Sequence, residues 1–110
     1  MNQIIAVIPS ESLEVVRSAL IALNIGGMTI SENLQHARAL DLNESSWMID
    51  SFGMTRIEIV SIPEDVNEIL RAIIAWVRET SSRPRGIVYV SELEEVIRIR
   101  TQEKDCGAIQ

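Results

Sequence analysis

Two amphipathic stretches, each flanked by short strand-like runs, constrain the fold of this sequence more than any other feature. The apolar positions of the first stretch are Leu13, Val16, Leu20 and Leu23. Those of the second are Val66, Ile69, Leu70, Ile73, Trp76 and Val77. Apolar residues three and four positions apart line one side of a helix. The sequence therefore predicts two helices, each with one buried face.

Four short runs of extended character surround these helices: residues 3–8, 28–34, 54–61 and 87–90. The resulting order is strand–helix–strand, a long connection, and strand–helix–strand again, which matches the ferredoxin-like β-α-β-β-α-β motif. We therefore expect an α+β fold, with an antiparallel sheet and both helices on one face. The other face would carry apolar residues without helices to cover them, which favours an oligomer. The length of 110 residues indicates a single domain over residues 1–110.

Helix boundaries and one further strand follow from local signals. Ser10 is the expected N-cap of the first helix, and Asn24 with the glycines after it ends that helix. The run from Ser61 to Glu64 matches a capping box for the second helix. Residues 96–101 are expected to be extended.

Charge and hydropathy exclude several classes of protein. The net charge of −6 argues against a nucleic-acid binder, which needs a basic surface. No apolar run approaches the roughly 18 residues of a membrane span, so we expect no direct membrane insertion. The first eight residues lack the features of a signal peptide, and the single Cys106 has no internal disulfide partner. These observations predict a cytoplasmic protein.

The sequence offers little catalytic equipment. His36 is the only histidine, and neither it nor Cys106 sits in a nucleophile or metal-ligand spacing. Neither a Walker A motif nor GxGxxG is present. We expect no enzyme, no metal and no required cofactor.

The arginines are the strongest positive signal. Four of them, Arg83, Arg85, Arg98 and Arg100, lie in one short C-terminal stretch. A planar guanidinium donates two parallel hydrogen bonds to a phosphate or carboxylate. In a strand, Arg98 and Arg100 would share one face about 7 Å apart, a span that suits a diphosphate or triphosphate. Pairing with surface carboxylates explains the same residues equally well.

Three segments resemble the PII nitrogen-regulatory family. Residues 94–101 read EEVIRIRT and are followed by Glu103, residues 25–32 read IGGMTISE, and residues 56–60 read RIEIV before Pro63. The resemblance implies a homotrimer of ferredoxin-like subunits with an adenine nucleotide (ATP, ADP or AMP) in the clefts between them. It also implies that a T-loop, here residues 35–53, contacts a target protein such as an enzyme or transporter, and leaves residues 102–110 as a tail.

The resemblance also assigns roles residue by residue. The nucleotide contacts it implies are Gly27, Met28, Thr29, Arg38, Glu58, Val60, Gly86, Arg98 and Arg100. We add Arg83 and Arg85, which lie near the position of the lost B-loop lysine and supply positive charge there. Trp47 and Phe52 would be presented to the partner protein.

The chain departs from the family pattern where ligands bind. Residues 35–39 lack the two glycines and the glutamine found at the base of the T-loop, and Met54 replaces a lysine that contacts 2-oxoglutarate. Trp47 stands where the family has a uridylylated tyrosine, and Ile87 replaces the lysine of the phosphate-binding B-loop. Sensing of 2-oxoglutarate and uridylylation are therefore not expected.

Two functions remain open. The first is a regulatory sensor that binds an adenine nucleotide between subunits. The alternative is a PII-like trimer that has lost nucleotide binding and either senses another small anion, such as bicarbonate or a carboxylate, or acts as an interaction module. A small enzyme on the same fold is a third reading, and the absence of an acid–base pair disfavours it.

Overall fold

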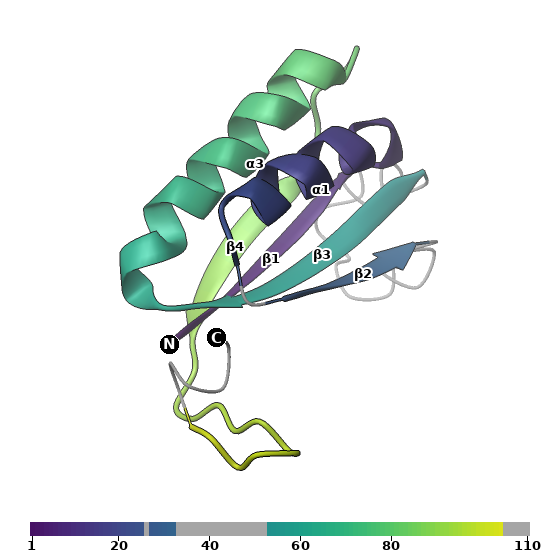
Figure 1. Ribbon diagram of the computed structural model, residues 1–110. Helices are drawn as coiled ribbons and strands as arrows, with labels where there is room; N and C mark the ends of the chain where they lie inside the picture. Colours follow the sequence, from purple (N-terminus) through teal and green to yellow (C-terminus); the bar gives the residue numbers. More distant parts are fainter. Residues whose placement is uncertain (26, 33–52, 105–110) are drawn as a thin grey trace, which may run out of the picture.

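A computed structural model describes residues 1–25, 27–32 and 53–104 of the chain, and Figure 1 shows a sheet with helices packed on one face. The elements in chain order are β1 (Asn2–Pro9), η1 (Ser10–Ser12), α1 (Leu13–Ala22), β2 (Met28–Glu32), β3 (Met54–Ser61), η3 (Pro63–Asp65), α3 (Val66–Thr80) and β4 (Ile87–Glu92). The strand order is β2-β3-β1-β4, and all neighbours are antiparallel. The predicted ferredoxin-like α+β fold is confirmed.

The core lies between the sheet and the two helices. Alternate residues of β1 point toward the helices, and Ile4 pairs with Ile59 while Ala6 pairs with Ile57. Ile69 and Ile73 of α3 pack on this layer and are fully buried. Burial of an isoleucine side chain stabilises the fold by roughly 1.5–3 kcal/mol, so this apolar layer accounts for the position of both helices.

The opposite face of the sheet is open, and its composition is mixed. Ile5 and Val7 of β1 are only 6% and 4% exposed, because residues of the two flanking strands lie beside them. On the edge strand β4, Ile87 and Tyr89 remain 43% and 46% exposed. The expected apolar residues are thus present on β1 and β4, but only those of β4 are exposed, and β3 contributes charged residues.

Both helices begin differently from the sequence prediction. A short 3-10 turn precedes each one, η1 before α1 and η3 before α3. The Ser10 hydroxyl lies 2.8 Å from the Thr55 hydroxyl and caps no helix, and the Ser61 hydroxyl donates to the carbonyl of Ile62 at 2.8 Å. The predicted N-cap and the capping box are therefore wrong, because these hydroxyls have closer partners elsewhere.

The end of α1 agrees with the prediction. Asn24 adopts the left-handed conformation, with φ of 59°, directly after the helix. Asparagine tolerates this conformation better than most residues, which explains why the helix stops here. Within the described residues, neither helix is long and apolar enough to span a membrane.

Candidate functional site

One group of predicted ligand residues lies at the β2 edge of the sheet. Thr29 of β2 pairs with Glu58 of β3, and Val60 follows two residues later on the same open face. Gly27 is exposed just before β2. Met28 points the other way and packs against the core, so its backbone is the part that remains for a ligand. Four of these five residues therefore share an accessible edge.

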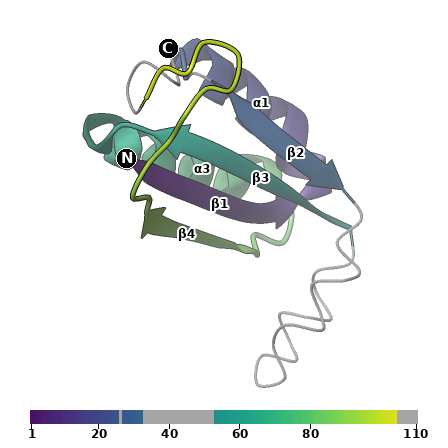
Figure 2. The same ribbon diagram turned by 90° about the horizontal axis from the view of Figure 1, so that it is seen from below.

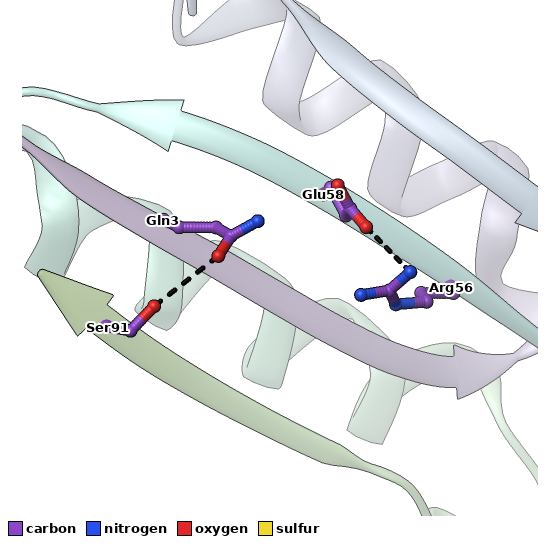
Figure 3. A network of polar contacts seen from close by, with 4 residues as sticks. All are labelled: Gln3, Arg56, Glu58 and Ser91. Atoms are coloured by element: carbon purple, nitrogen blue, oxygen red, sulfur yellow. Dashed lines mark hydrogen bonds and ion pairs between the residues drawn. The ribbon is translucent and has the colours of Figure 1, made fainter. Parts of the chain in front are cut away.

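The carboxylate of Glu58 already has a partner. The Nη1 atom of Arg56 lies 2.6 Å from Oε1 of Glu58, and both side chains are about one-third exposed (36% and 32%). Figure 3 shows the pair on β3, with Gln3 of β1 and Ser91 of β4 beside it on the same face. An exposed ion pair contributes at most about 1 kcal/mol, so a ligand can compete for either group.

Arg56 was not among the predicted ligand residues. The signal that could have identified it is the spacing of Arg56 and Glu58, two residues apart in a strand. That spacing puts both side chains on one face, close enough to pair.

A second group lies in the loop before β4. Gly86 has φ of 114°, and a Cβ atom added there would lie 2.1 Å from the carbonyl oxygen of Val7. Only glycine fits this close approach of two backbones. Arg83 is exposed and Arg85 half-buried in the same loop. The predicted loop glycine is thus fixed by contact with β1.

A pocket of about 320 Å³ adjoins this loop, between the end of α3 and the start of β4. Its lining includes Arg85 and Gly86, together with Arg78 from the last turn of α3. Arg78 is a cation that the sequence prediction missed, because it was read only as part of a helix. Cations are the only charged side chains among its lining residues, which suits an anion or an amphipathic partner.

The segment that carries Arg98 and Arg100 is not a strand. Ile97 and Lys104 form an isolated antiparallel bridge, the Arg98 amide donates to the carbonyl of Glu103 at 2.8 Å, and residues 99–101 form a turn. The amide of Gln102 donates back to the carbonyl of Arg98 at 2.7 Å. The prediction that residues 96–101 are extended is therefore wrong from Ile99 onward. Strand alternation consequently no longer places Arg98 and Arg100 on one face.

A tight hairpin explains this difference. Gln102 adopts φ of 61°, which reverses the chain, and Lys104 pairs with Glu95 at 3.3 Å. Ile99, expected to anchor one face of a strand, is 93% exposed at the turn.

The chain does not bring these groups together by itself. β2 and β4 are opposite edges of the sheet, separated by β3 and β1. At the usual strand spacing this separation is about 14 Å. Figure 2 shows the segment after β4 on the side of the sheet turned away from the helices. The candidate residues thus form two half-sites and a hairpin.

Some predicted residues lie outside the described part of the chain. These are Arg38, Trp47 and Phe52, together with most of the expected T-loop segment 35–53. His36 and Cys106 also lie there. Among residues 1–25, 27–32 and 53–104, no group of three His, Cys, Asp or Glu side chains is arranged to hold a metal ion.

Comparison with known proteins gives one consistent result. The family model for nitrogen regulatory protein P-II matches residues 1–103. The chain is 36% identical over 113 positions to nitrogen regulatory protein P-II 2 of Methanothermobacter thermautotrophicus, with 99% of this chain and 97% of the relative covered. It is 34% identical over 113 positions to nitrogen regulatory protein P-II 1 of Escherichia coli, with 99% and 100% covered.

Proposed function

The chain belongs to the nitrogen regulatory protein P-II family, and from this premise we propose that it is a sensor that binds an adenine nucleotide between subunits and signals to a partner protein. Members of the family are regulatory proteins. In this proposal, residues 1–110 form one PII-like domain that is cytoplasmic, has no catalytic activity and requires no cofactor.

The observation that carries the proposal is the division of the ligand residues between two sheet edges. Gly27, Thr29 and Glu58 lie at the β2 edge, whereas Arg85 and Gly86 lie beside β4. A nucleotide that uses both sets needs two copies of the chain, with the β2 edge of one beside the β4 edge of the next. Division of the residues therefore supports a site between subunits.

The same edges support a closed assembly. In the described part of the chain, β2 and β4 have no strand on their outer sides. Exposed strand edges invite pairing with another chain, and a contact between unlike edges closes into a ring when the rotation allows. Exposed Ile87 and Tyr89 add apolar surface near one edge. We propose the homotrimer that the family resemblance implies.

Charge at the β4 edge supports an anionic ligand. Arg83 and Arg85 lie in the loop before Gly86, and Arg78 lines the adjoining pocket. Each charge-assisted hydrogen bond from an arginine to a phosphate contributes roughly 1.5–3 kcal/mol. Pro84 restricts the loop and so lowers the entropy lost on binding.

The burial of Met54 supports the expected loss of 2-oxoglutarate sensing. Met54 is 2% exposed at the start of β3, and its methyl carbon lies 3.2 Å from where a Cβ on Gly86 would be. A thioether packed in this way offers no charge to a dicarboxylate.

The ion pair of Arg56 with Glu58 favours the alternative function. A nucleotide that hydrogen-bonds Glu58 must displace Arg56 or share the carboxylate with it. A protein that no longer binds nucleotide, and senses bicarbonate or a carboxylate instead, has no such competition. The two functions therefore differ in ligand class and share the assembly.

Isothermal titration calorimetry with ATP, ADP and AMP tests the proposal. We expect binding to the wild-type protein, and a loss of about 10- to 100-fold in affinity in Arg98→Ala and Arg85→Ala, because each removes a charge-assisted bond. Arg71→Ala, an exposed arginine on α3, is the matched control and should bind like wild type. Absence of heat with all three nucleotides, together with thermal stabilisation by bicarbonate or a carboxylate, would establish the alternative.

Signalling through residues 35–53 is proposed from the resemblance alone. Trp47 and Phe52 are the partner contacts it implies, and a target enzyme or transporter is the implied partner. A pull-down with Trp47→Ala against wild type tests this part, and equal recovery of partners by both would contradict it.

A further inference from the structure

The short turn η1 contacts two distant parts of the chain. On one side, the Ser10 amide donates to the carbonyl of Gly53 at 2.9 Å, and the Ser10 hydroxyl lies 2.8 Å from that of Thr55. On the other side, the Ser81 hydroxyl donates to Oε1 of Glu11 at 2.9 Å. Consecutive residues of η1 therefore hold the start of β3 and the start of the loop before β4.

A second contact reinforces the side that faces α3. The hydroxyls of Thr80 and Ser12 lie 2.9 Å apart, and the Thr80 hydroxyl also donates to the carbonyl of Trp76 at 2.6 Å. Ser12 is fully buried and Ser81 is 7% exposed. Buried hydroxyls that lose a partner stay unpaired, which costs more than the bond contributes at the surface. Breaking any one of these contacts without the others is therefore unfavourable.

The contacts of η1 link the start of the loop before β4 to the start of β3. Ser81 begins the loop that carries Arg83, Arg85 and Gly86. Gly53 and Thr55 mark where the chain returns into the sheet at the start of β3. The end of α3, the beginning of α1 and the start of β3 all lie at one end of the molecule (Figure 1).

We infer that Glu11 and Ser12 are positioning residues for the ligand loop 81–86, and that Ser10 transmits the position of this loop to Gly53 and Thr55. This inference rests on the proposed function, because it gives the loop a ligand. Movement of Ser81 on binding pulls on Glu11, and η1 is too short to absorb the movement without changing the bonds of Ser10. A continuous chain of hydrogen bonds is one physical route for coupling between two sites, and these contacts form such a chain.

Amide exchange in the ligand-free protein tests the connection directly. The Ser10 amide reports on its bond to Gly53, and NMR measures its exchange with solvent. We expect exchange about five- to tenfold faster in Ser81→Ala and Glu11→Ala, the range that corresponds to the loss of one hydrogen bond. Glu11→Gln keeps an acceptor oxygen and should restore most of the protection.

Two controls separate this effect from general destabilisation. Glu14→Ala removes a neighbouring carboxylate whose partner is the exposed Arg17, and it should leave exchange at Ser10 unchanged. The amide of Ile57, in the middle of β3, should exchange at the wild-type rate in every variant. Unchanged exchange at Ser10 in Ser81→Ala, or equal acceleration at Ile57, would overturn the inference.

Exchange with saturating ADP tests whether the ligand uses this connection. In the wild-type protein we expect ADP to slow exchange at Ser10 by about threefold or more, the size of a modest coupling between sites. In Glu11→Ala, ADP should still bind while its effect on Ser10 disappears. Binding of ADP to the wild-type protein without any change at Ser10 would refute the coupling. Failure of ATP, ADP and AMP alike to bind would refute the proposed function, and coupling to that ligand with it. The ligand-free experiment alone decides whether the connection exists.

Discussion

The loop before β4 and the segment after it each carry two arginines, yet they are held in different ways. The loop, residues 81–86, is fixed to the body of the protein at both ends. Ser81 donates to Glu11, and Gly86 lies against the carbonyl of Val7. The segment after β4, residues 93–104, is tied to the body at its start, where the Leu93 amide donates to the carbonyl of Met1 at 2.9 Å. Among the described residues from Ile97 onward, two backbone hydrogen bonds and one bridge close this segment into a hairpin.

This difference shows which part of the candidate site a single chain can build. The loop has its shape set by contacts within the subunit, and its arginines start from a defined backbone. The hairpin presents Ile97 and Ile99 to solvent at 49% and 93% exposure, and apolar surface gathered in this way is available to a neighbouring copy. We therefore expect the loop to be formed in an isolated subunit, and the hairpin to gain its final contacts from a neighbouring copy.

Gly86→Ala gives the largest expected effect, because it breaks the anchored region. The new Cβ atom would lie 2.1 Å from the Val7 carbonyl oxygen at a φ of 114°. We expect a loss of at least about 3 kcal/mol in the free energy of unfolding, or failure to fold. Urea denaturation measures it. Gly27→Ala is the control, since nothing lies within 4 Å of its Cβ, and equal stability of the two variants would contradict the anchoring.

Ile99→Ser sharpens the comparison at the hairpin. It should leave the fold intact, because the Ile99 side chain is 93% exposed. If a neighbour covers this side chain, its loss weakens association by roughly 1.5–3 kcal/mol, or about 10- to 100-fold. Sedimentation equilibrium measures the change. Val15→Ser on α1 is the control, and identical association of both variants with wild type would show that the hairpin is not covered.

Glu95→Gln gives the smallest expected effect. Its ion pair with Lys104 closes the hairpin at 3.3 Å, but both side chains are more than half exposed. Exposed pairs of this kind contribute little, so we expect a change below about 0.5 kcal/mol in unfolding free energy. Thermal denaturation at low and high salt measures it. A larger loss would mean that the hairpin contributes to the stability of the whole subunit.

The fold was predictable because its signals are spread over many residues. Several buried residues together produce the helical spacing around Ile69 and Ile73. The same holds for the alternation from Met54 to Ser61. Helix starts depend on one hydroxyl each, and there the prediction failed. Ser10 has a partner in Thr55, 45 residues away, which no local pattern contains.

The candidate site was predictable only in part, for a similar reason. Alternation placed Thr29, Glu58 and Val60 on one face, as the strand register has them. The same alternation places Arg56 beside Glu58, although Arg56 was not among the predicted ligand residues. It did not show that the chain would reverse at Gln102. The hairpin depends on two backbone hydrogen bonds, and these leave no signal in the residue types around them. The alternating Ile and Arg residues therefore predicted a strand.

The burial of Met54 limits which side chains position 54 can accept. Its side chain fills the space beside Gly86, at 2% exposure. A lysine here, which the family resemblance implies, would place an ammonium group in a buried position, and an unpaired buried charge is costly. A lysine at position 54 therefore requires the loop at Gly86 to move at the same time. Positions 54 and 86 are therefore epistatic: the effect of a lysine at one depends on the packing at the other.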